Sequence, residues 1–202
     1  REPTSRHVSE FFHFVVSRAK VDPSREQFQG YFDRTNSIHE YYLRFMSTSR
    51  IIPKSLDEKQ QAVAKILKDY DFIGITERMH ESLVALQMIL KLETRDLLYL
   101  SAKQNGGWDD GLAGGQCYYI TQTTISDKLQ EYFHSDEWQR QVEGDDLLYV
   151  TVNKSLDMTI DNLGRDQFDR LLKRYKWALK EVQRICQSKV VFPCSAGGEL
   201  VE

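Results

Sequence analysis

Arg1 and Ser9 are the first residues of this chain whose types and spacing suit a chemical role. They lie in the opening stretch REPTSRHVSEFF, where Pro3 fits the first position of a helix because its missing N–H costs nothing there. A guanidinium matches the geometry of phosphate oxygens, and a serine hydroxyl can add a further hydrogen bond. An arginine before a helix is also commonly solvated or paired with a carboxylate. The stretch therefore predicts either a phosphate-binding helix start or a structural ion pair.

Histidines are the candidates for proton transfer near neutral pH. His13 is the most interesting, because it lies four residues beyond Ser9 in the same predicted helix. We therefore take His13 as a candidate catalytic base. Arg18 and Lys20, near the end of that helix, suit contact with an acidic glycan. They suit a solvated helix end equally well, because the helix dipole favours cations there. The other histidines are His7, His39, His80 and His134.

The overall composition is that of an ordinary soluble domain. The chain has 202 residues, of which 41% are hydrophobic and 28% charged. Its net charge is −3 and its isoelectric point is about 6.0, which does not indicate a nucleic-acid partner. No run approaches the roughly 18 consecutive apolar residues of a membrane span, and no signal peptide is visible.

The cysteines do not have the spacing of a metal site. Cys186 and Cys194 are too far apart for a C-x2-4-C pair, and Cys117 is remote in sequence. Two interpretations remain open: three buried thiols, or one disulfide with a leftover thiol. No bound metal is expected.

The elements that would position these residues can be read from the apolar spacing. A helix is predicted over residues 3–20, and 71–75 (DFIGI) reads as a short buried strand. Thr76 can cap the helix that follows over 77–92, and 96–101 (DLLYLS) reads as a second strand. Strand, helix and strand in about 30 residues are typical of a parallel sheet with right-handed crossovers.

The rest of the chain reads as loops and helices within one domain over residues 1–202. Residues 21–37 look like a loop, with a helix after Ser37 and another capped by Ser55 in a capping box. Beyond the glycine-rich stretch 102–116, the chain is almost wholly helical. In that part we predict helix caps at Ser126 and Ser135, a helix end at Gly164 and a last helix over 166–186.

Three stretches together resemble the sulfotransferase superfamily, in its carbohydrate (heparan sulfate) branch. The opening Arg1-Glu2-Pro3, Arg6 and Ser9 is similar to the R-[DE]-P-x-x-R-x-x-S segment of that family. FIGITERMHESLVALQMILKL is similar to its G-[LIV]-T-E signature. LLYVTVNKSLDMTIDNLG and the long helix after it resemble the C-terminal portion, so the resemblance spans nearly the whole chain.

The resemblance implies an enzyme that moves a sulfuryl group from 3′-phosphoadenylyl sulfate to a hydroxyl of a carbohydrate. Arg1 and Ser9 match the positions that bind the 3′-phosphate of the donor. Arg6 matches the motif too, but a salt bridge that holds the helix explains it equally well. Lys103, in the glycine-rich loop, matches a loop that closes on the nucleotide, although an exposed loop lysine explains it as well.

The resemblance also implies an architecture and a cellular location. The expected fold is a P-loop-like parallel sheet flanked by helices, incomplete in this chain, with a helical C-terminal portion. The strand, 5′-phosphosulfate loop and general base would precede Arg1, so this chain alone is not expected to be active. Members of the family sit in the Golgi lumen as type II membrane proteins behind a single N-terminal anchor. Residues 1–202 would make no membrane contact, and the family chemistry needs no metal.

Two other functions remain open. A non-catalytic binding or scaffold relative would keep the fold and lose the site. A P-loop nucleotide or sugar kinase would need a Walker loop, and no G-x-x-x-x-G-K-[ST] motif is present. Asn153 begins an N-x-[ST] sequon. Its place at the edge of an apolar helix stripe favours a structural side chain over a glycan. A polar pair with Asp157, one turn further along the helix, would also fit a structural side chain.

Overall fold

The chain folds mainly into helices. A computed structural model describes residues 1–35, 40–47, 53–100, 107–109, 117–187, 194–195 and 197–200. The chain divides into two compact units. The first comprises Arg1–Pro3, His39–Tyr99 and Val142–Cys186, and the second comprises Thr4–Ile38, Leu100–Gln141 and Gln187–Glu202. Within the described segments, no helix is both long enough and apolar enough to cross a bilayer.

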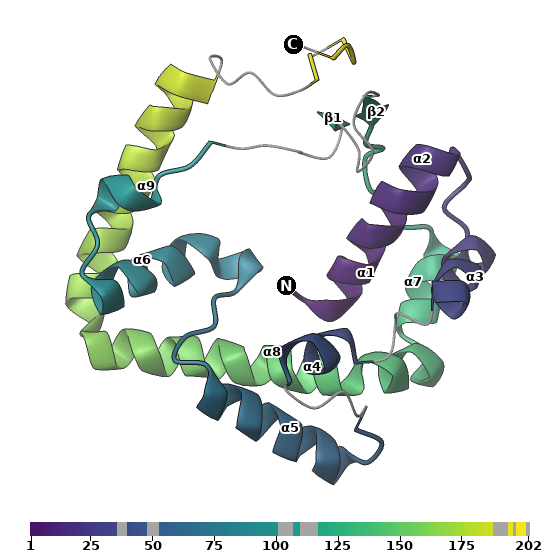
Figure 1. Ribbon diagram of the computed structural model, residues 1–202, viewed down its shortest axis with the longest axis horizontal. Coiled ribbons are helices and arrows are strands. Elements are labelled where there is room, and N and C mark those ends of the chain that lie inside the picture. The colour runs from purple at the N-terminus through teal and green to yellow at the C-terminus, as the bar shows by residue number, and fades with distance from the viewer. Residues whose placement is uncertain are drawn as a thin grey trace. The chain divides into compact units, whose positions relative to one another are not determined.

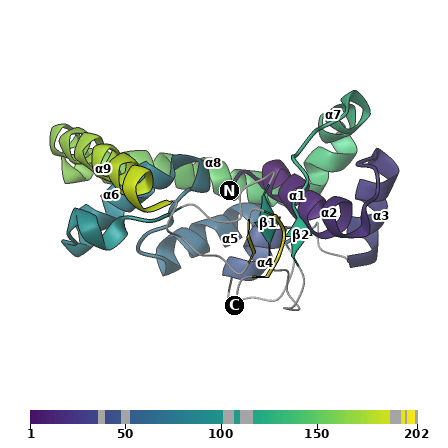
Figure 2. The same cartoon turned by 90° about the horizontal axis from the view of Figure 1, so that it is seen from above.

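The first unit is built from helices around one apolar core. Its elements are α4 (Tyr41–Met46), α5 (Leu56–Asp69), η2 (Thr76–Arg78), α6 (Met79–Leu90), η3 (Thr94–Leu97), most of α8 (Asp136–Leu163) and α9 (Arg165–Cys186). Figures 1 and 2 both show α6 beside α9, and the two helices contact each other. Buried side chains on α8 and α9 supply much of this core, among them Leu148, Leu156, Ile160, Phe168 and Tyr175.

Local signals fix two boundaries in this unit. Ser55 accepts a hydrogen bond from the Glu58 N–H at 3.2 Å while the Glu58 carboxylate accepts one from the Ser55 N–H at 3.1 Å. This capping box satisfies N–H groups that the first turn of α5 leaves unpaired. Gly164, with φ of +92°, separates α8 from α9 in a conformation that favours glycine. Both boundaries were predicted from the sequence, and both are confirmed.

The second unit is built around aromatic side chains. Its elements are α1 (Pro3–Phe11), η1 (Phe12–Val16), α2 (Ser17–Ala19), α3 (Arg25–Thr35), β1 (Trp108–Asp109), β2 (Tyr118–Tyr119), α7 (Asp127–Phe133) and the first turns of α8. The ring of Phe28 lies within 5.4 Å, centroid to centroid, of the rings of Phe11, Phe133 and Trp138. These rings join α1, α3, α7 and α8 through edge-on contacts, which suit aromatic pairs.

A disulfide also stabilises the second unit. It joins Cys117 to Cys194 across 77 residues of sequence, and Cys186 in the first unit is a free thiol. Of the two interpretations left open by the cysteine pattern, one disulfide with a leftover thiol is therefore the one that the structure shows.

The predicted P-loop-like parallel sheet is wrong. The described residues contain one pair of strands, β1 and β2, which run antiparallel. Residues 72–75 join no ladder, and the N–H of Ile75 donates to the Ser82 hydroxyl at 2.9 Å instead. Glu93 and Asp96 form a capping box at the 3₁₀ helix η3, which takes in the first two residues of the second predicted strand, Asp96 and Leu97. A strand needs a neighbour for its N–H and C=O groups, and apolar composition alone does not supply one.

The helix predictions fared better. The predicted helix over residues 3–20 is confirmed as α1, η1 and α2 in succession, ending where Lys20 turns left-handed at φ of 52°. The final helix is also confirmed, as α9. The loop predicted for 21–37 is wrong, because Ser24 caps α3 by accepting from the Gln27 N–H at 3.2 Å. The predicted Thr76 cap is wrong too, since Thr76 lies inside η2. The single domain over residues 1–202 stays a prediction.

Candidate functional site around Glu77

Glu77 lies where three distant stretches of the first unit meet. Its Oε1 accepts a hydrogen bond from the Glu2 N–H at 3.1 Å and lies 4.0 Å from Nε of Arg1. Its Oε2 accepts from the Tyr149 hydroxyl of α8 at 3.5 Å. The 3₁₀ turn η2 positions Glu77 just before α6. One carboxylate therefore ties the segment before α1 to the start of α6 and to the middle of α8.

Arg78 also connects the start of α6 with α8. Its guanidinium contacts the Glu81 carboxylate one turn along α6 and donates to Oδ1 of Asp157 at 2.7 Å. It also donates to the backbone carbonyl of Asn153 at 3.4 Å. Arg78 thus joins the start of α6 to α8 while its charge is matched by two carboxylates, so this guanidinium is a structural link.

A cleft of about 290 Å³ opens beside Glu77. Residues 76–81 and Lys176 of α9 line it. Lys176 is exposed and makes no ion pair within the segments that the structure describes. The cleft therefore places a cationic side chain opposite the N-terminal turns of η2 and α6.

Asp146 of α8 is an acid of this unit whose pKa is strongly raised. Burial raises the pKa of Asp146 to about 6, and the negative charges of Glu2 and Glu40 contribute to the shift. A carboxyl group with such a pKa is partly protonated near pH 6. It can therefore give or take a proton under mild conditions, which makes it a candidate for acid–base chemistry.

Arg1 and Ser9 take up the positions expected of them at the start of the chain. Arg1 lies two residues before Pro3, the first residue of α1, and belongs to the first unit; its side chain is 41% exposed. Ser9 lies in the second turn of α1, in the second unit, and is half-buried. Arg6 forms an ion pair with Glu10 at 2.7 Å, so it holds the helix as the structural interpretation proposed. The role of Arg1 and Ser9 in binding phosphate stays a prediction.

His13 belongs to a polar cluster of the second unit. Its Nε2 lies 3.5 Å from Oδ2 of the buried Asp109 and 3.2 Å from Nη2 of Arg18. The Arg18 guanidinium also lies over the ring of Phe14, 4.9 Å from the centroid. His13 is thus held by a carboxylate and a guanidinium, and its role as a base stays a prediction.

The remaining expectations have mixed outcomes. Lys103 lies outside the described residues. The Asn153 side chain donates to the Tyr149 carbonyl at 3.0 Å, in keeping with the structural interpretation of that asparagine. Its expected partner Asp157 pairs with Arg78 instead.

Sequence reasoning missed Glu77, the centre of this site, and Asp146, an acid of the same unit with a raised pKa. Glu77 stands in the G-I-T-E stretch that was singled out, so its place in a motif could have drawn attention to it. Asp146 gave no signal, because its raised pKa depends on burial and on Glu2 and Glu40, which are far away in sequence.

No protein-family model matches this chain, and neither the curated proteins nor the solved structures that were searched contain a match.

Proposed function

We propose that this chain forms part of a sulfotransferase that moves a sulfuryl group from 3′-phosphoadenylyl sulfate to a hydroxyl of a carbohydrate. In the reaction, the bond from sulfur to the bridging phosphate oxygen breaks as a bond forms between sulfur and the acceptor oxygen. The acceptor proton passes to a base, and adenosine 3′,5′-bisphosphate leaves. Positioning of the two reactants and stabilisation of the charge on the transferring group accelerate such a displacement.

The observation that supports this proposal most is the convergence on Glu77. The three stretches whose sequences resemble the sulfotransferases are far apart along the chain. Each contributes to this junction: Glu2 through its N–H, Glu77 itself, and Tyr149 through its hydroxyl. Segments that share a function are expected to meet in space, whereas chance similarities have no reason to do so.

In this proposal, Arg1 and Ser9 bind the 3′-phosphate of the donor and take no part in the chemical step. The ion pair of Arg1 with Glu77 is long, at 4.0 Å, and both side chains are more than a third exposed. Such a pair contributes about 0–1 kcal/mol. A phosphate can therefore replace the Glu77 carboxylate as the partner of Arg1 at little cost. Glu77 then acts as a positioning residue, because it still holds the Glu2 N–H.

The disulfide adds support on the question of compartment. Disulfides such as Cys117–Cys194 form and persist in oxidising environments, which include the secretory pathway. A location in the Golgi lumen, which we also propose, agrees with this chemistry.

The proposal is tested by measuring whether the protein distinguishes a 3′-phosphate. Adenosine 3′,5′-bisphosphate and adenosine 5′-phosphate are titrated separately by calorimetry into the protein. We expect the bisphosphate to bind at least about tenfold more tightly, because a charge-assisted hydrogen bond contributes about 1.5–3 kcal/mol. Equal affinities would reject the donor assignment. Selective binding without transfer to any sugar would favour the scaffold alternative.

A further inference from the structure

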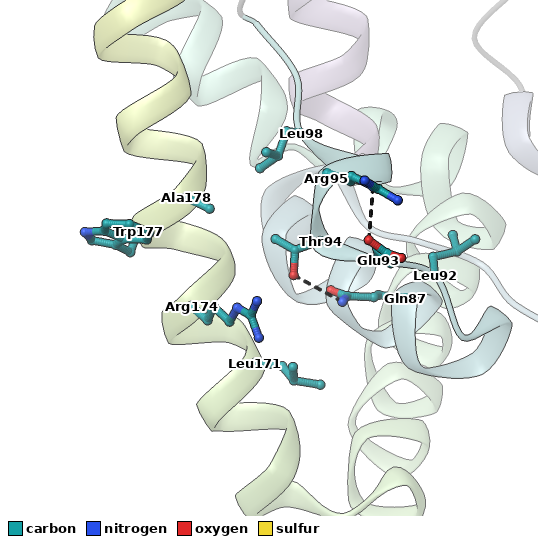
Figure 3. A pocket seen from close by; sticks show the side chains of 10 residues that line it. All are labelled: Gln87, Leu92, Glu93, Thr94, Arg95, Leu98, Leu171, Arg174, Trp177 and Ala178. Carbon is teal, nitrogen blue, oxygen red and sulfur yellow. Dashed lines mark hydrogen bonds and ion pairs between the residues drawn. The ribbon is translucent and has the colours of Figure 1, made fainter.

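A pocket of about 580 Å³ lies between α9 and the end of α6 with η3, within the first unit (Figure 3). Its walls are largely apolar, with Leu92, Leu98 and Leu171 among them. This volume is in the range of small-molecule sites, which are typically apolar with a few polar groups that orient the ligand. The pocket lies at the last turn of α6, whereas Glu77 precedes the first turn.

Gln87 supplies a polar group inside this pocket. Its side chain is buried, with 7% of the residue exposed, and its Nε2 donates to the Thr94 hydroxyl at 3.3 Å. No donor in the described part of the chain reaches its Oε1, which is fully buried. A buried amide oxygen without a donor costs about 1–3 kcal/mol. Rotation of the Gln87 amide toward the pocket is therefore favoured when a ligand there donates a hydrogen bond to Oε1.

Arg174 supplies a positive charge at the same pocket. It is exposed on α9, and Figure 3 shows its guanidinium and the Gln87 amide pointing toward each other. Arg174 forms no ion pair with any residue that the structure describes. The other arginine of the pocket, Arg95, is different, since its Nε lies 3.0 Å from the Glu93 carboxylate. Arg174 is therefore the cation that can pair with an anionic ligand.

We propose that this pocket binds a small aromatic carboxylate that carries an N–H or O–H donor on its ring. The leucine side chains contact the ring, Oε1 of Gln87 accepts from the ring donor, and Arg174 pairs with the carboxylate toward solvent. Trp177, which is 67% exposed, borders the same pocket. This site is independent of the proposed sulfuryl transfer, and neither assignment depends on the other.

Three related probes separate the contributions of the two polar groups. Indole-3-acetate has the ring N–H and the carboxylate, 1-methylindole-3-acetate lacks the N–H, and indole-3-ethanol lacks the carboxylate. Calorimetry on the full chain is expected to show the tightest binding for indole-3-acetate. Loss of the N–H is expected to weaken binding about tenfold, and loss of the carboxylate about fivefold or more.

Two substitutions connect these preferences to single residues. Gln87→Leu is expected to remove the preference for indole-3-acetate over its N-methyl analogue, because no acceptor is left to distinguish them. Arg174→Gln is expected to remove the preference over indole-3-ethanol. Arg184→Gln, which removes an exposed arginine of α9 that pairs with Glu181 outside the pocket, serves as the control and should alter neither ratio. Arg174 is exposed, so its variant should fold even if the Gln87 variant does not.

The proposal is overturned by any of three results. The first is that indole-3-acetate does not bind at millimolar concentration. The second is that the three probes bind with equal affinity. The third is that Arg174→Gln and Arg184→Gln weaken binding equally, which would indicate a general effect of charge.

Discussion

Replacing Gly144 by alanine is expected to destabilise the first unit. Gly144 lies in α8, and its N–H donates to Oε1 of Glu40 at 3.3 Å. A methyl group on Gly144 would lie 2.6 Å from Cδ1 of Leu43 and closer still to Oε2 of Glu40. A glutamate can usually move aside, but Glu40 is 3% exposed and its Oε1 lies 2.6 Å from the Lys59 ammonium. The new methyl group must therefore disturb a buried ion pair.

The expected size follows from two opposing effects. Breaking a buried ion pair costs about 3–5 kcal/mol, because it leaves a buried charge without its partner. Alanine is favoured over glycine in a helix by about 1 kcal/mol. The net loss of unfolding free energy is therefore about 2–4 kcal/mol. Burial disfavours the charged form of Lys59, but Glu40 and Glu143 together raise its pKa, which agrees with an intact ion pair.

The assay is urea denaturation followed by far-ultraviolet circular dichroism. Gly30→Ala is the matched control, because a methyl group on Gly30 in α3 would meet nothing within 4 Å. It is expected to stabilise the protein by about 0.5–1 kcal/mol. If both alanine variants shift the denaturation midpoint in the same direction by similar amounts, the description of the Gly144 contact is wrong.

Three further predictions concern charge and covalent structure. Glu77→Gln keeps an acceptor for the Glu2 N–H but removes the anion that competes for Arg1. Calorimetry should therefore show adenosine 3′,5′-bisphosphate binding about two- to fivefold more tightly. Weaker binding would count against the replacement of Glu77 by a phosphate as the partner of Arg1. Asp146 has a pKa raised from 3.8 to about 6, so its contribution to stability is lost as pH rises through 6. The Asp146→Asn variant should therefore gain stability relative to the parent between pH 4.5 and 7.5 in urea denaturation, and a constant difference would contradict this. Replacing Cys117 and Cys194 together by serine should cost about 4 kcal/mol, as expected for closing a loop of this length, while Cys186→Ser should have little effect; a loss of stability from the Cys186 change alone would contradict the pairing.

Much of the helical structure could be predicted because its signals are local. Pro3 begins α1, Ser55 caps α5 and Gly164 separates two long helices, and each does so through its own backbone or side chain. Helix α3 was missed because Pro23 and Gly30 were interpreted as loop residues. In the structure Pro23 precedes the Ser24 cap, and Gly30 is tolerated in the middle of the helix.

The parallel sheet was predicted wrongly because pairing between strands is not a local property. The run 71–75 has the apolar, β-branched composition of a strand, yet its Ile75 is paired with the Ser82 side chain. Tertiary capping is equally hard to foresee. Asp145, which is fully buried, accepts hydrogen bonds from the N–H groups of Tyr42 and Leu43 at 2.9 and 3.0 Å and so caps α4 from another helix.

The candidate site could be predicted only where its signals are local. Arg1, which contacts Glu77, was singled out from a short motif around a helix start, which is local information. The contact of Glu77 with Glu2, 75 residues away, and the raised pKa of Asp146 depend on the packing of distant segments. The spacing of residues along the chain does not predict such contacts.

The most direct test of the proposed function combines the Arg1→Ala variant with the two adenosine nucleotides. The substitution should weaken binding of adenosine 3′,5′-bisphosphate about tenfold or more and leave binding of adenosine 5′-phosphate unchanged, because the guanidinium would contact only the 3′-phosphate. Arg184→Ala, which removes an exposed and paired arginine of α9, is the control and should change neither affinity. An equal loss for both nucleotides, or no loss for either, would contradict the assignment of Arg1 to the donor.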